Sequence, residues 1–78
     1  MLNLVRKTNS FFRTATAAEI NAVRDAIVLT ERQAEIFERF YIKKQTVTFI
    51  GDTIGTSPRN VTRELNLIRA KIAVVKGF

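Results

Sequence analysis

The chain has 78 residues, 46% of them hydrophobic, and its 13 basic and 7 acidic side chains give a net charge of +6. This length fits one domain with a small core and a thin margin of stability. The absence of cysteine and histidine excludes disulfides, thiolate metal sites and histidine-based catalysis. No apolar run approaches the ~20 residues that cross a bilayer. We therefore expect a cytoplasmic protein without cofactor or metal. We also expect no enzymatic activity, because the carboxylates form no paired arrangement that supports chemistry.

The first 14 residues allow three interpretations. Their apolar side chains are Leu2, Leu4, Val5, Phe11 and Phe12, and polar or charged residues separate them. The segment could form an additional helix, an arm or a dimerisation contact. It lacks the uninterrupted apolar core of a signal peptide.

Capping signals predict the next two helices, near residues 17–29 and 31–43. Thr16 is followed by Glu19, and Thr30 by Gln33, at the spacing of a capping box. One apolar face follows each start: Ile20, Val23 and Ile27 in the first helix, and Ile36, Phe37, Phe40 and Tyr41 in the second. We expect these three aromatic residues, and Phe49 further on, to lie in the core.

Two more helices are predicted near residues 47–55 and 58–72. Thr46 is suited to cap the first, and Gly55 to end it in the left-handed conformation. Ser57 can cap the second helix, with Pro58 in its first position. The tail 73–78 could prolong this helix or form a short strand. The expected fold is therefore an all-α bundle of four or five helices in a single domain, residues 1–78.

The junction between these two helices fits the helix-turn-helix pattern. Gly51 is a small residue on the first helix, Gly55 provides the turn, and Val61 can pack between the two helices. Alanine is usual at the position of Gly51, and glycine there costs up to about 1 kcal/mol of helix propensity.

The segments "LTERQAEIFERFYI" and "VTFIGDTIGTSPRNVTRELNLIRAKI" resemble the fourth conserved region of bacterial sigma factors. They are also similar to the DNA-binding domain of LuxR-type response regulators. The resemblance covers residues 29–72 and implies a DNA-binding helix-turn-helix domain. Residues 1–28 match neither family, and we expect a free-standing small regulator of phage or plasmid type.

The predicted last helix has a polar stripe opposite its apolar one. With Val61 set at 0°, the apolar residues Leu65, Ile68 and Ile72 lie within about 40° of it, and Arg59, Arg63 and Asn66 lie about 140–160° away. The candidate base-contacting residues are Arg59, Asn60, Thr62, Arg63 and Asn66. The candidate phosphate-contacting residues are Lys43, Lys44, Thr46, Thr48, Ser57, Arg69 and Lys71. Leu67 lies outside both stripes and could contact the N-terminal segment or a second copy.

The charge distribution agrees with a polyanion partner. Residues 1–42 carry six basic and five acidic side chains, a balance of +1. Residues 43–78 carry seven basic and two acidic side chains, a balance of +5.

The preferred hypothesis is a nucleoid-associated transcriptional regulator, for example a repressor. It would bind double-stranded DNA as a homodimer and insert the helix near 58–72 into the major groove. One alternative is a small terminase-like subunit for phage DNA packaging. Another is a protein-interaction module that contacts RNA polymerase.

Overall fold

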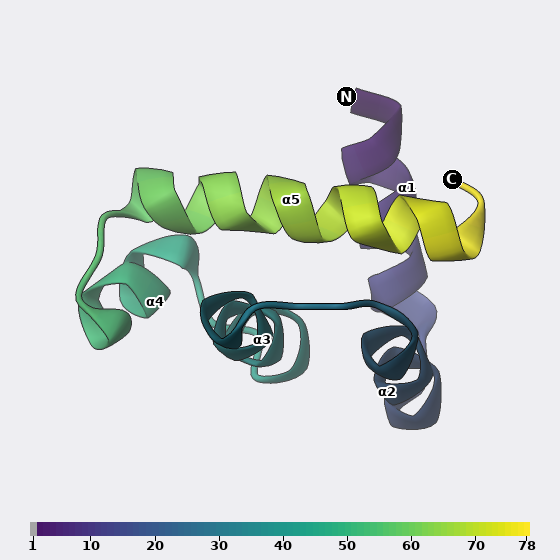
Figure 1. Cartoon of the computed structure of the whole chain (residues 1–78), viewed down its shortest axis with the longest axis horizontal. Coiled ribbons are helices and arrows are strands. Elements are labelled where there is room, and N and C mark those ends of the chain that lie inside the picture. The colour runs from purple at the N-terminus through teal and green to yellow at the C-terminus, as the bar shows by residue number, and fades with distance from the viewer. Residues whose placement is uncertain (1) are drawn as a thin grey trace. The chain divides into compact units, whose positions relative to one another are not determined.

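The computed structural model describes residues 2–78, with side chains from Val5 onward, and all regular secondary structure in this part is helical. Figure 1 shows its five α-helices: α1 (Leu2–Thr14), α2 (Ala17–Ala26), α3 (Glu31–Phe37), α4 (Val47–Ile54) and α5 (Pro58–Lys76). A π-helical turn, η1 (Glu38–Ile42), follows α3 directly. The predicted all-α class and the number of helices are confirmed. The structure forms a helix over residues 2–14, and a dimerisation contact by this segment stays a prediction. Residue 1 and the side chains of Leu2 and Leu4 lie outside the described part.

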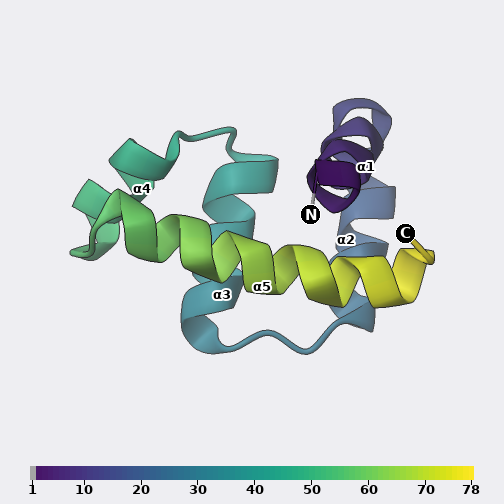
Figure 2. The same ribbon diagram turned by 90° about the horizontal axis from the view of Figure 1, so that it is seen from above.

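The described residues form two compact units. The central unit comprises Leu29–Ile68, and the terminal unit comprises the residues up to Val28 together with Arg69–Phe78. The central unit therefore contains α3, η1, α4 and the first part of α5. The terminal unit contains α1, α2 and the last part of α5. Figure 2 shows α5 as one long, continuous helix.

Side-chain caps fix the starts of α2 to α5 where the sequence predicts them. Each capping hydroxyl accepts a hydrogen bond from the backbone N–H three residues later: Thr16 from Glu19 at 3.2 Å, Thr30 from Gln33 at 3.1 Å, Thr46 from Phe49 at 3.1 Å, and Ser57 from Asn60 at 3.2 Å. The capping boxes of α2 and α3 are complete, because the Glu19 and Gln33 side chains accept in return from the cap backbone N–H. These local hydrogen bonds satisfy donors that the first helical turn leaves open.

The ends of the helices follow the predicted boundaries less closely. α2 ends at Ala26, three residues earlier than predicted, because the next residue, Ile27, has an extended backbone. The predicted helix 31–43 is present as α3 and η1, and the Lys43 N–H donates to the Glu38 carbonyl over five residues. Lys44 then adopts a left-handed conformation, with φ 59°. Residues 73–76 prolong α5, which is one of the two alternatives for the tail.

The core of the central unit consists of the predicted apolar faces. Ile36 and Phe37 from α3, Ile50 from α4, and Val61, Leu65 and Ile68 from α5 are at most 1% exposed. Tyr41 is also buried, and its ring centroid lies 5.2 Å from that of Phe37. Burial of side chains of this size contributes roughly 1.5–3 kcal/mol each, so the apolar faces of α3, α4 and α5 together stabilise the unit.

Phe49 corrects the prediction for the aromatic residues, since its side chain is 53% exposed. On a helical projection with Ile50 at 0°, Val47 and Ile54 fall at about +60° and +40°, whereas Phe49 falls at about −100°. The short helix α4 has one buried face, and Phe49 lies well away from it. Phe40 is half-buried, so only Phe37 and Tyr41 are fully inside.

The terminal unit has its own small core. Its buried residues are Thr8, Phe12, Ile20, Val23, Ile27 and Ile72. Next to them, the Lys76 ammonium lies 4.6 Å from the centroid of the Phe11 ring, within the range of a cation–π interaction. The Lys71 ammonium donates to the Val28 carbonyl at 2.6 Å, close to the end of α2. The last turns of α5 thereby contact both α1 and the segment that follows α2.

Candidate functional site

The turn between α4 and α5 is fixed by backbone hydrogen bonds on one carbonyl. The Gly51 carbonyl oxygen accepts from the N–H groups of Gly55 and Thr56, the latter at 2.8 Å. Gly55 has φ 77°, the left-handed conformation predicted for it. The Ser57 cap begins α5 immediately afterwards, so the first turn of α5 has a defined position relative to α4.

The first two turns of α5 present a polar face to solvent. Arg59, Asn60, Thr62 and Arg63 are all exposed, whereas Val61 and Leu65 are buried. Asn66, one turn further, is half-buried. The structure therefore brings the predicted base-contacting residues onto one side of one helix, with Asn66 at its edge.

Arg32 joins this surface, although no local sequence pattern predicts it there. A hollow of about 360 Å³ is lined by Arg32, Thr56, Asn60, Arg63 and Glu64. Within it, the Asn60 amide nitrogen donates to the Thr56 hydroxyl at 3.0 Å, which holds the amide against the turn. Because Arg32 is 31 positions before Arg63 in the chain, only the tertiary packing of α3 near α5 places it here. The half-buried Glu64 adds one negative charge to the same hollow.

The predicted phosphate-contacting residues fall into two groups. Lys43, Lys44, Thr46, Thr48 and Ser57 are exposed in the central unit, and Arg69 and Lys71 are half-buried in the terminal unit. Three members also have structural roles. The hydroxyls of Thr46 and Ser57 cap α4 and α5, and Lys71 donates to Val28. Lys43 and Lys44, which follow η1, are the exposed cationic members of the group in the central unit.

The net charge of each unit differs from the charge balance of the two sequence halves, because the units do not coincide with the halves. The central unit holds six basic and five acidic side chains, a balance of +1. The terminal unit holds seven basic and two acidic side chains, a balance of +5. The exposed face of α5 is therefore locally cationic on a unit that is nearly neutral as a whole.

Within residues 2–78, no group of His, Cys, Asp or Glu side chains could hold a metal ion. In the same part of the chain, none of the helices combines the length and the apolar character that a bilayer span requires. Comparisons with protein-family models, with curated proteins and with solved structures found no match to this chain.

Proposed function

We propose that the central unit is a helix-turn-helix module that binds double-stranded DNA and regulates transcription. The observation that carries the proposal is the exposed, acid-free row of Arg59, Asn60, Thr62 and Arg63 at the start of a helix whose opposite face is fully buried. Helices that read the major groove present their N-terminal residues to base edges while the following helix body packs on the domain. α4, the turn at Gly55 and α5 provide this arrangement of elements.

The proposed mechanism divides the exposed polar residues by their chemistry. Arg59 and Arg63 can each donate two hydrogen bonds to a guanine edge, and Asn60 can pair with adenine. Lys43 and Lys44 would bind phosphates, which fix the register of the module on the duplex but carry little sequence information. Arg32 lines the same hollow as Arg63 and would contribute a further contact to base or backbone.

A module of this size reads only a few base pairs, so we propose that it acts as a homodimer on two half-sites. The terminal unit offers apolar surface that a second copy could cover. Val28 and Val74 are 86% and 84% exposed, and they line one hollow of about 330 Å³ together with Val75.

Selection of bound duplexes from a random DNA pool tests the proposal. We expect enrichment of one short sequence motif, present as an inverted repeat if the protein binds as a symmetric dimer. Recovery of DNA without any enriched motif would argue against sequence-specific recognition, and no recovery at low salt would argue against DNA binding altogether.

A second candidate function is a protein-interaction module that contacts a component such as RNA polymerase. The observation in its favour is the exposure of two large apolar side chains of the central unit, Phe49 at 53% and Leu67 at 48%. Exposed apolar side chains are common in monomers, but aromatic ones are enriched at interfaces. If this function holds, Phe49→Ser and Leu67→Ser reduce capture of the polymerase, while DNA affinity stays low at physiological salt.

The terminase-like alternative is separated from both by a mass measurement in solution. A packaging subunit would form a ring of many copies, whereas the proposed regulator forms a dimer.

A further inference from the structure

Helix α1 is the most uniformly cationic element of the terminal unit. It carries Arg6, Lys7 and Arg13, and the chain has no acidic residue before Glu19. The first acidic side chain in the chain, Glu19, already accepts a hydrogen bond from the Thr16 N–H at 2.9 Å. The proposed recognition of DNA by α5 makes no use of these three cations.

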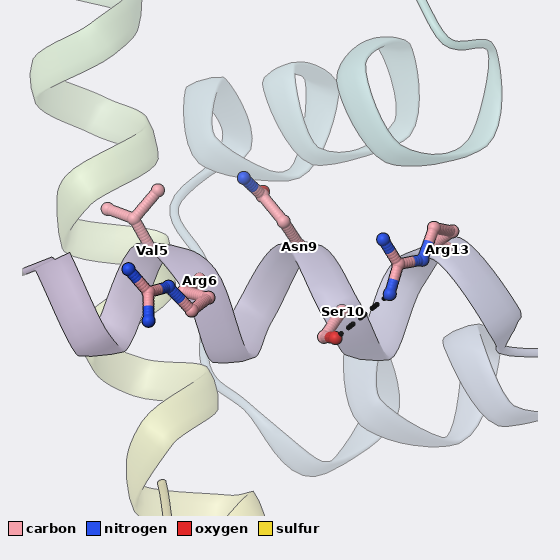
Figure 3. Close-up of a pocket in the computed structure, with 5 residues that line it drawn as sticks. All are labelled: Val5, Arg6, Asn9, Ser10 and Arg13. Atoms are coloured by element: carbon pink, nitrogen blue, oxygen red, sulfur yellow. Dashed lines mark hydrogen bonds between the residues drawn. The ribbon is translucent and has the colours of Figure 1, made fainter.

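The two arginines lie on one face of α1 with polar side chains between them. On a helical projection with Arg6 at 0°, Arg13 falls at about −20°, Ser10 at about +40° and Asn9 at about −60°. These four residues and Val5 line a hollow of about 540 Å³ (Figure 3). The Arg13 guanidinium donates to the Ser10 hydroxyl at 3.3 Å, the dashed contact in Figure 3. Two like charges on one exposed helix face, on a helix without acidic residues, attract anions.

The opposite face of α1 is already occupied by protein. Thr8 is fully buried, Phe12 is 5% exposed, and Phe11 is half-buried with its ring 5.0 Å from that of Phe12. A helix that lies on a membrane must insert an apolar face between the lipids. From Val5 onward, the side chains of α1 opposite Arg6 pack in the core of the terminal unit, so the face left to solvent suits an anion in water.

We propose that the Arg6–Arg13 face of α1 binds the phosphate backbone of DNA as a second contact surface in addition to α5. The choice of DNA as the polyanion rests on the proposed function of the central unit. The two arginines are two helical turns, about 10 Å, apart along the axis, so each can bind a separate phosphate. A guanidinium forms paired hydrogen bonds to phosphate, and Asn9 and Ser10 supply further donors between the two arginines. Contacts of this kind raise affinity for every sequence and leave sequence preference unchanged.

The test is a DNA-binding titration of the whole chain at several salt concentrations. In the double variant Arg6→Gln with Arg13→Gln, two phosphate contacts are lost. We expect the slope of log affinity against log salt to shrink by about 1.8 in magnitude, and the affinity at 0.1 M salt to fall roughly 10- to 60-fold. The loss should be equal for a preferred site and an unrelated duplex. The double variant Arg6→Lys with Arg13→Lys keeps both charges and should retain the slope.

Arg24→Gln is the matched control, since Arg24 is an exposed arginine on α2 of the same unit. Each single variant, Arg6→Gln or Arg13→Gln, should reduce the slope more than Arg24→Gln does. Melting followed by circular dichroism checks that the variants fold.

Slopes equal to that of the Arg24→Gln control would overturn the proposal that α1 binds DNA. They would leave the function proposed for α5 untouched. That function fails separately, if Arg63→Ala leaves sequence preference unchanged. A double variant that loses binding to anionic lipid vesicles but keeps its full DNA affinity would assign the face to membranes and also overturn the proposal.

Discussion

A Cβ atom added to Gly51 would lie 2.7 Å from the carbonyl oxygen of Thr56 and 3.3 Å from the nitrogen of Pro58. The neighbouring atoms belong to the backbone of the turn, so they cannot move aside like the end of a flexible side chain. Gly51 is therefore required by the close approach of α4 to the start of α5. The steric contact therefore explains why this position holds glycine and not alanine.

Gly51→Ala should destabilise the protein by about 1–2 kcal/mol, because the steric cost exceeds the gain of about 1 kcal/mol in helix propensity. The measurement is the free energy of unfolding in urea. A variant that is more stable than the parent, as alanine is at an unhindered helix position, would show that the turn does not pack in this way.

Lys44 offers a test of backbone strain beside the candidate site. Its φ of 59° is unfavourable for a side chain with a Cβ atom, whereas its neighbour Lys43 has an ordinary φ of −84°. Lys44→Gly should raise the free energy of unfolding by about 0.5–1 kcal/mol, and Lys43→Gly, which removes the same charge, should lower it. Both should reduce DNA affinity to a similar extent if the two lysines contact phosphate. Equal losses of stability in the two variants would contradict the left-handed conformation of Lys44.

The Thr16–Glu19 capping box makes stability depend on pH. Hydrogen bonds from the backbone and side chain of Thr16, the backbone bond foremost, lower the pKa of Glu19 below its usual 4.5. A carboxylate with a lowered pKa contributes stability that is fully present above the unfolded pKa and is lost as pH falls through the folded pKa. The melting temperature should therefore fall with pH below about 4.5, and part of this fall should disappear in Glu19→Gln.

The second capping box shows that glutamine can replace glutamate in this role. There the Gln33 amide oxygen accepts from the Thr30 N–H, and it carries no ionisable group. Other carboxylates contribute to the acid transition, so the comparison is the difference between parent and variant at each pH. Parallel curves for Glu19→Gln and the parent between about pH 3 and 6 would exclude a role for the Glu19 charge in the cap.

Local interactions explain which structural features the sequence predicts well. A helix cap joins residues three positions apart, so Thr46 and Ser57 identify their helices without any knowledge of the fold. The apolar stripe of α5 is similarly local, and each of its predicted members, from Val61 to Ile72, is buried. The same helical projection correctly assigns Arg59 and Arg63 to the exposed side, because it depends only on the spacing of residues along one helix.

Features that depend on distant parts of the chain could not be predicted in this way. The approach of Arg32 to Arg63 reflects the packing of α3, whereas the exposure of Phe49 follows from its angle to Ile50 on α4. The distribution of charge also depends on the fold. α5 contributes Arg69, Lys71 and Lys76 to the terminal unit, so the basic half of the sequence is divided between the units.

The most direct test of the central claim is a comparison of Arg63→Ala with Arg24→Ala. Affinity is titrated on a selected DNA site and on the same site with single base-pair changes, at fixed salt concentration. DNA recognition by α5 predicts that Arg63→Ala weakens binding to the selected site by roughly 1–3 kcal/mol and removes discrimination at one base pair, whereas Arg24→Ala retains it. An unchanged pattern of base-pair discrimination in Arg63→Ala would contradict this role of the exposed face of α5.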